Sequence, residues 1–178
     1  TAANDRRLVF VGSFTHEPNR DAMLYFCGDV LPLIHAEEPE VRLRIIGNAP
    51  TPEIRRLAAD RVEVLGYVPD IRPIFEMSAI SIAPLRFGGG MKGKIGEAMS
   101  FGLPVVTTSI GIEGFGLEPG KHVLVGDDPK AFANAVVGLL RDGRYRDGVR
   151  MAGWQFIRDN FSDVAVRRRV HILLDQLD

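Results

Sequence analysis

Apolar residues in this chain occur in short continuous runs, separated by longer segments in which they recur every three or four positions. The short runs end at glycine, proline or polar residues, as buried strands do, and they lie at 8–11, 41–47, 62–66, 80–84, 105–108 and 122–125. The longer segments predict helices at 22–34, 52–59, 71–77, 95–101, 129–141, 145–160 and 164–177. Pro32 should kink or break the first helix, because its ring removes a backbone donor and clashes with the preceding turn.

The alternation of strands and helices predicts an α/β protein with a parallel sheet. Right-handed crossovers leave few arrangements, and a doubly wound, Rossmann-like six-stranded sheet of order 3-2-1-4-5-6 fits, with helices on both faces. In that order the first and fourth strands flank the point at which the strand order reverses. We therefore expect Gly12 and Ser13, after the first strand, to lie beside the loop 88–97 after the fourth.

The stretch 80–112 carries the clearest chemical pattern, a strand followed by a glycine run and a helix. Glycines 88–90 let a ligand approach the backbone, and the first N–H groups of the following helix carry partial positive charge. Lys92 and Lys94 add two cations there, and Glu97 lies about one turn into the helix, within reach of a hydroxyl such as that of a ribose. The pattern favours a phosphate site, and the alternative is a tight structural turn with solvated lysines.

The bulk composition narrows the class of protein. The 178 residues are enough for one domain with a full core, and a net charge of −1 gives no reason to expect a nucleic acid partner. A single cysteine, Cys27, excludes an internal disulfide, suggests a reducing compartment such as the cytoplasm, and fits an apolar helix face better than a reactive site. No metal-ligand spacing, membrane-spanning run or G-x-G-x-x-G fingerprint appears, so neither a metal nor NAD is expected.

Three other features allow two interpretations each. Glu113, in the loop 111–116, faces the predicted crevice or is an ordinary surface acid. Tyr67 and Val68 belong to a binding loop or simply pack. The arginines at 167–169 form a solvated helix face or, less favoured, a peripheral contact with a membrane surface. The start at Thr1, without methionine, suggests a processed chain or a piece of a longer one.

The stretch 94–106, in which a Glu-Ala-Met helix is followed by Gly-Leu-Pro-Val-Val, resembles the carboxyl-terminal domain of group 1 (family 4) glycosyltransferases of the GT-B fold. The remaining segments are similar in character through nearly the whole chain. The resemblance implies that 1–178 is a single nucleotide-sugar-binding domain, that 143–178 are its carboxyl-terminal helices, and that an amino-terminal acceptor domain is missing from this chain.

The resemblance also implies roles for individual residues. Glu97 would hold the ribose hydroxyls, Gly12 would let the backbone approach the diphosphate, and the loop with Tyr67 and Val68 would contact the base. The backbone amides of residues 91–93 would face the sugar and the phosphates. The candidate donor-binding residues are Gly12, Ser13, Tyr67, Val68, Arg86, Gly89, Gly90, Met91, Lys92, Gly93, Lys94 and Glu97.

The chain departs from the family pattern at two places. The family often has a second glutamate where this chain has Gly89, so the usual contact with the donor sugar cannot form. The family also often has an arginine and a lysine in the first loop, where this chain has Ser13 and Asn19. Lys92 and Lys94 are expected to supply that charge from the other side of the crevice.

The resemblance implies a retaining glycosyltransferase that moves a sugar from a nucleoside-diphosphate sugar to a glycan or lipid-linked acceptor, without a metal or other cofactor. Alone, the chain would bind donor but not transfer sugar. Two alternatives are a nucleotide-sugar epimerase on the same fold and a non-catalytic α/β binding module. The expected location is the cytoplasm, and the alternative is a peripheral location at the inner face of the membrane.

Overall fold

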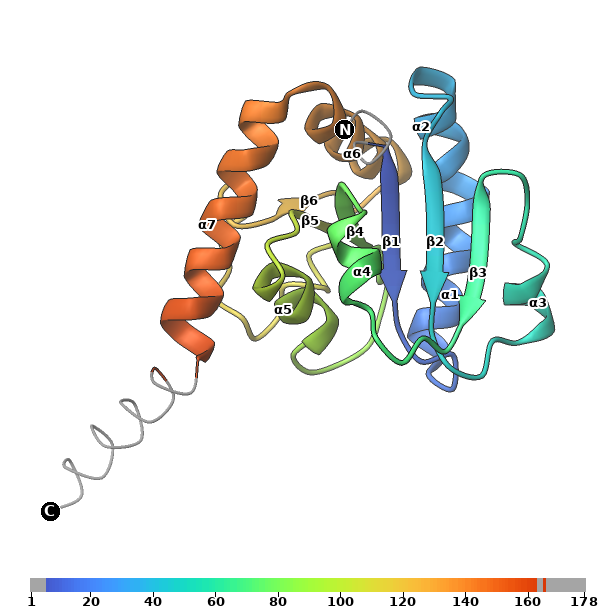
Figure 1. Ribbon diagram of the computed structural model, residues 1–178, viewed down its shortest axis with the longest axis horizontal. Coiled ribbons are helices and arrows are strands. Elements are labelled where there is room, and N and C mark those ends of the chain that lie inside the picture. The colour runs from blue at the N-terminus through green and yellow to red at the C-terminus, as the bar shows by residue number, and fades with distance from the viewer. Residues whose placement is uncertain (1–5, 163–164, 166–178) are drawn as a thin grey trace, which may run out of the picture.

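The computed structural model of the protein describes residues 6–162 and 165. Their six strands form one sheet of order β3-β2-β1-β4-β5-β6, in which every adjacent pair is parallel. Figure 1 shows β1, β2 and β3 pointing the same way. The strands are β1 (Arg7–Val11), β2 (Arg42–Ile46), β3 (Val62–Gly66), β4 (Ile80–Ala83), β5 (Val105–Thr107) and β6 (Leu124–Val125). The predicted strand order and parallel pairing are thus confirmed.

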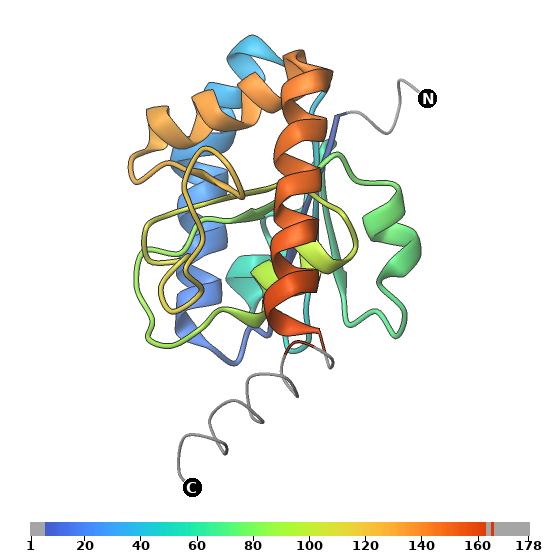
Figure 2. The ribbon, with the colours of Figure 1, turned by 90° about the vertical axis from the view of Figure 1, so that its left-hand side faces the viewer.

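Helices cover both faces of the sheet, as predicted. Figure 2 shows α1 and α6 on one side of the strands and α4 on the other. The helices are α1 (Glu17–Tyr25), the π-helical segment η1 (Phe26–Val30), α2 (Leu31–Glu37), α3 (Pro52–Arg55), α4 (Arg72–Glu76), α5 (Gly93–Ser100), α6 (Pro129–Arg141) and α7 (Gly143–Phe161).

Two hydrophobic clusters fill the space between the sheet and these helices, and β1 contributes to both. Leu8 and Phe10 point into the cluster that contains α1, α2 and α6, whereas Val9 points into the cluster of α4 and α5. Successive side chains of a strand point to opposite faces, which explains the alternation. All three side chains are fully buried, so β1 forms the centre of the core and its carboxyl end is held rigidly.

The break in the first helix lies earlier than Pro32. The helical hydrogen bonds widen to a π-helical turn over Phe26–Val30, and Pro32 lies in the first turn of α2. A proline is tolerated in a first turn because its missing N–H would have no partner there, and the widened turn accommodates its ring.

Both α3 and β6 are only half as long as their apolar patterns predict. α3 ends at Arg55 because Ala59 exchanges two backbone hydrogen bonds with Val62 (3.0 and 3.2 Å). β6 begins only at Leu124, because the N–H of His122 donates to the carbonyl of Glu118 (3.0 Å) in a turn. In each case a local turn competes with the regular element.

The predicted last helix, 164–177, and the arginines at 167–169 lie almost wholly outside the described residues. Within the described part of the chain, no helix is both long enough and apolar enough to cross a bilayer.

The start of α6 provides a stability test away from the site discussed below. The side chain of Asp128 caps the helix by accepting a hydrogen bond from the N–H of Ala131 (2.8 Å). Replacing Asp128 with Ala should lower the free energy of unfolding by about 1 kcal/mol. Urea denaturation measures this, and Asp60→Ala, which removes only an exposed, weakly paired carboxylate, should stay within about 0.5 kcal/mol of wild type.

Candidate functional site

At the carboxyl ends of β1, β2 and β3, the residue that follows one strand donates a hydrogen bond to the last residue of the neighbouring strand. The N–H of Gly12 donates to the carbonyl of Ile46, and the N–H of Gly47 to that of Gly66, both at 2.9 Å. These strand ends lie so close together that a Cβ atom on Gly47 would sit 1.8 Å from the carbonyl oxygen of Gly12. The edge is therefore formed by closely packed backbone with no intervening side chain.

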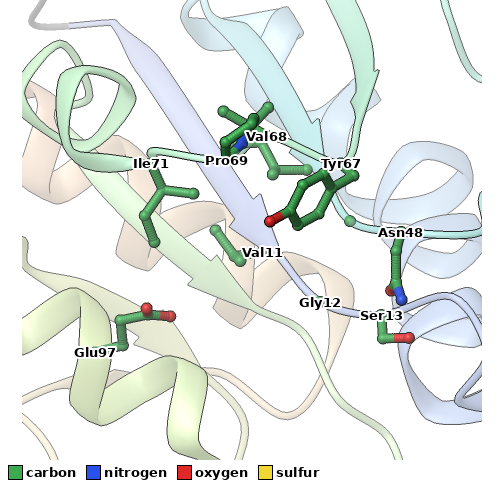
Figure 3. A pocket seen from close by; sticks show the side chains of 11 residues that line it. Val11, Gly12, Ser13, Asn48, Tyr67, Val68, Pro69, Ile71 and Glu97 are labelled. Atoms are coloured by element: carbon green, nitrogen blue, oxygen red, sulfur yellow. The ribbon is translucent and has the colours of Figure 1, made fainter.

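A cleft of about 460 Å³ opens at this edge. Figure 3 shows its arrangement: Glu97 comes from α5 on one side, Tyr67 from the loop after β3 on the other, and the end of β1 runs between them. The lining residues are Val11, Gly12, Ser13, Ile46, Gly47, Asn48, Tyr67, Val68, Pro69, Ile71 and Glu97. The cleft is thus lined by both polar and apolar groups, and Glu97 provides a carboxylate among them, which suits a flat ring carrying hydroxyl groups.

Five of the sequence-predicted site residues meet in this cleft: Gly12, Ser13, Tyr67, Val68 and Glu97. They come from three separate stretches of the sequence, and the doubly wound topology brings them together at the reversal of strand order, where such folds bind ligands. Tyr67 is 72% exposed, so its ring forms an open wall that can pack against a ligand rather than part of the core.

The other predicted residues, in the loop 86–94, lie beyond Gly12 and do not line the cleft. Gly88 (φ 118°) and Gly90 (φ 75°) adopt left-handed backbone conformations that require glycine, whereas Gly89 does not. A Cβ on Gly88 would be 3.2 Å from Pro18, so this loop packs against the first turn of α1. Met91 and Gly93 are exposed at the start of α5.

The structure pairs Arg86 with α1 rather than leaving it free. Its guanidinium donates to both carboxylate oxygens of Asp21, at 2.8 Å through Nε, and lies 4.8 Å from the centre of the Tyr25 ring. The hydrogen bonds to Asp21 raise the pKa of Arg86. This pair fastens the loop 86–94 to α1, and a direct contact of Arg86 with a ligand stays a prediction.

Lys94 points across the crevice to the first turn of α1. Its ammonium donates to the side-chain oxygen of Asn19, whose amide donates to the carbonyl of Ser13 (2.7 Å), and lies 4.7 Å from the centre of the Phe10 ring. Burial, aided by the charge of Lys92, lowers the pKa of Lys94 from 10.5 to about 8. A cation that burial disfavours this strongly, beside a glycine and a helix start, marks this point as a place for an anion.

Glu113 lies close to the same loop without entering the cleft. It is exposed, and a Cβ on its neighbour Gly114 would be 3.9 Å from the Cβ of Met91. Both interpretations of Glu113 therefore stay open.

Sequence reasoning missed the wall of the cleft contributed by the end of β2, namely Ile46, Gly47 and Asn48. Gly47 follows an apolar strand directly, as Gly12 does, and that shared position was the available signal. Among the described residues, no group of three or more His, Cys, Asp or Glu lies close enough together to hold a metal ion.

Comparison with known proteins gives the family context of this site. Residues 5–142 match the family model for glycosyl transferases group 1. The chain is 28% identical over 160 residues to phosphatidyl-myo-inositol mannosyltransferase of Mycobacterium leprae, covering 86% of this chain and 42% of that protein. It is 25% identical over 168 residues to an uncharacterized 44.6 kDa protein in the cps region of Klebsiella pneumoniae, covering 89% and 43%. The chain thus spans less than half the length of these relatives.

Solved structures share the fold at low sequence identity. HepE from Anabaena, in complex with UDP and glucose, superposes with a TM-score of 0.77 at 18% identity, over 98% of this chain and 49% of that one. The carboxyl-terminal domain of LpcC, a group 1 family glycosyl transferase from Francisella tularensis, gives 0.70 at 12% identity, over 92% and 94%. Because the family model extends across every strand of the sheet, from just before β1 to the end of α6, this chain belongs to the group 1 glycosyltransferases.

Proposed function

We propose that this chain is the donor-binding domain of a glycosyltransferase that uses a nucleoside-diphosphate sugar. The observation that carries the proposal is the cleft at the carboxyl ends of β1, β2 and β3, which is closed on one side by the carboxylate of Glu97. The nucleoside lies in this cleft, with its base along the loop of Tyr67 and Val68 and its ribose hydroxyls donating to Glu97. A neighbour in complex with UDP and glucose, HepE, supports the same class of ligand.

The diphosphate then extends over Gly12 toward the start of α5. Gly12 has no side chain to obstruct this path, and the first N–H groups of α5 favour negative charge at the helix end. The donor sugar lies at the exposed residues Met91 and Gly93. Since Gly89 offers no carboxylate, the sugar is selected by backbone groups and by the missing domain.

In the proposed reaction the bond between the anomeric carbon of the sugar and the diphosphate oxygen breaks, the acceptor hydroxyl oxygen forms the new bond with retention of configuration, and its proton passes to the leaving diphosphate. Negative charge grows on the leaving diphosphate, and amides and cations fixed in advance stabilise it without a metal. The acceptor, a glycan or a lipid-linked sugar, binds to an amino-terminal domain across the cleft. The enzyme acts in the cytoplasm, where nucleotide sugars are substrates.

Nucleotide binding tests this proposal through thermal unfolding with UDP, GDP, ADP and their sugar conjugates. A ligand at about 100 times its dissociation constant stabilises the folded state by about 2.7 kcal/mol. For a domain of this size the unfolding temperature then rises by several degrees, at about 2–4 °C per kcal/mol. We expect one base to stand out, and Glu97→Gln to reduce the rise by removing the acceptor for the ribose hydroxyls.

The matched control is Glu40→Gln, which makes the same change at an exposed carboxylate just before β2. This residue lies at the amino ends of the strands, away from the cleft at their carboxyl ends. It should leave the nucleotide-dependent rise unchanged. If no nucleotide raises the unfolding temperature of the protein, the proposal is wrong, and a non-catalytic binding module becomes the better description.

A further inference from the structure

The two lysines at the start of α5 have different surroundings, although they are only two residues apart. The ammonium of Lys92 turns back onto its own loop and donates to the carbonyls of Gly88, at 2.8 Å, and Gly90. Both glycines have left-handed backbone conformations. The hydrogen bonds from Lys92 stabilise the loop in this conformation. Both of these hydrogen bonds join Lys92 to its own loop.

The side chain of Lys94 extends away from its own helix and reaches the first turn of α1. Asn19, which receives its hydrogen bond, is only 7% exposed and is itself fixed by donating to the carbonyl of Ser13. The ammonium is therefore positioned from outside α5, by a buried amide and by the face of Phe10.

The charge of Lys94 is not balanced. Among the residues that the structure describes, no carboxylate forms an ion pair with it, and Lys92 is the charged group that affects it most. Asn19 is neutral, so it satisfies one hydrogen bond but no charge. A half-buried ammonium without a counter-ion destabilises the fold unless an anionic ligand supplies the missing partner.

The free side of this ammonium faces the path of the ligand. A Cβ placed on Gly12 would lie 3.0 Å from the nitrogen of Lys94 and 2.9 Å from the amide of Asn19. A side chain at position 12 would therefore occupy the space next to the ammonium that glycine leaves open. An oxygen atom of a ligand that passes over Gly12 would be within hydrogen-bond distance of it.

We propose that Lys94, positioned by Asn19, is the cation that binds the diphosphate of the donor, and that Lys92 has a structural role as the clamp of the loop 88–90. This inference rests on the proposed function and divides between the two lysines a role that the sequence assigned to both. It also explains how a diphosphate is bound although this chain has Ser13 and Asn19 where the family often has an arginine and a lysine.

Calorimetric titration compares three ligands that share a base, UDP, UMP and uridine, and likewise the GDP and ADP series, with inorganic pyrophosphate as a base-independent probe. Lys94→Met should weaken binding of the diphosphates and of pyrophosphate about tenfold or more, because a hydrogen bond to a charged group is lost. Binding of the nucleosides should change less than about twofold. Lys94→Arg should recover part of the diphosphate affinity.

Lys92→Met is the matched control, since it removes the same charge at the same helix start. It should weaken the binding of diphosphates and nucleosides by similar factors of about threefold or less, because it loosens a loop but, under this proposal, removes no direct contact with the phosphates. Circular dichroism confirms that each variant is folded.

Two results overturn the inference while the proposed function stands: equal losses of diphosphate affinity in the two Met variants, or a loss in Lys94→Met that is as large for the nucleosides as for the diphosphates. If neither the nucleoside diphosphates nor pyrophosphate bind to the wild-type protein, the proposed function fails and the inference fails with it.

Discussion

Gly47→Ala is expected to lower the free energy of unfolding by about 3 kcal/mol or more, and to weaken nucleotide binding as well. The new methyl group would lie 1.8 Å from the carbonyl oxygen of Gly12, well inside van der Waals contact. The position of the methyl group is fixed by the backbone at position 47, and the oxygen belongs to the backbone of Gly12. No side-chain rotation can therefore relieve the contact, and the ends of β1 and β2 must separate. Urea denaturation measures the stability, and titration with the preferred nucleotide measures the binding.

Gly138→Ala in α6 is the matched control, because the same change there meets nothing within 4 Å. Alanine is favoured over glycine inside a helix, so this variant should be more stable than wild type by up to about 1 kcal/mol. The opposite signs separate the steric effect from any general effect of the substitution. A Gly47→Ala protein within about 0.5 kcal/mol of wild type would show that the strand ends are not held as closely as described.

Gly47 also illustrates what the sequence could and could not predict. Its position after an apolar strand was visible, but its contact with Gly12 depends on β1 and β2 being neighbours and on their register. Strand order followed from the alternation of strands and helices and from the handedness of crossovers, both of which are general rules. Register and the path of a loop depend on packing between residues far apart in sequence, which a pattern along one chain does not contain.

The lysines show the same limit at the level of side chains. The sequence placed Lys92 and Lys94 together at a helix start and predicted an anion there. It could not distinguish an ammonium that turns back to Gly88 from one that crosses to Asn19, because the second contact joins positions 75 residues apart. The fold was therefore predictable from periodicity, whereas the division of roles in the site required the structure.

Similar reasoning explains the first helix. The proline at position 32 correctly signalled an interruption, yet the π-helical turn at Phe26–Val30 precedes it. Phe26 packs edge-on against Phe132 of α6, with ring centres 5.8 Å apart, so tertiary contacts help to determine where the helix widens. Helix boundaries that depend on such tertiary contacts cannot be predicted from the helix propensities of the local sequence.

If Lys94 is retained for ligand binding, its removal should stabilise the free protein near neutral pH. In the folded state burial lowers its pKa to about 8, against an ordinary value of 10.5 in the unfolded chain. Below pH 8 Lys94 is protonated in both the folded and the unfolded state. The burial of this charge then lowers the free energy of unfolding by about 3 kcal/mol, which is the equivalent of the pKa shift. Lys94→Met removes this cost but leaves Asn19 without its donor, which costs about 1 kcal/mol. We expect the variant to be about 2 kcal/mol more stable than wild type at pH 7 by urea denaturation, while binding diphosphates more weakly.

The pH dependence of this difference identifies its cause. As the pH rises from about 8 to 10.5, folded Lys94 loses its proton before the unfolded chain does, so wild-type stability rises relative to the variant. The groups that other elements pack around the ammonium, Phe10 of β1 and Asn19 of α1, do not titrate, and Lys92 is the residue just before α5. Burial raises the pKa of Cys27 to about 12, which lowers stability above pH 9 in both proteins and cancels in the comparison. The higher stability of Lys94→Met should therefore vanish, and then reverse, by about pH 10.5. A stability difference that stays constant from pH 7 to that value would show that burial of the Lys94 ammonium does not destabilise the folded protein.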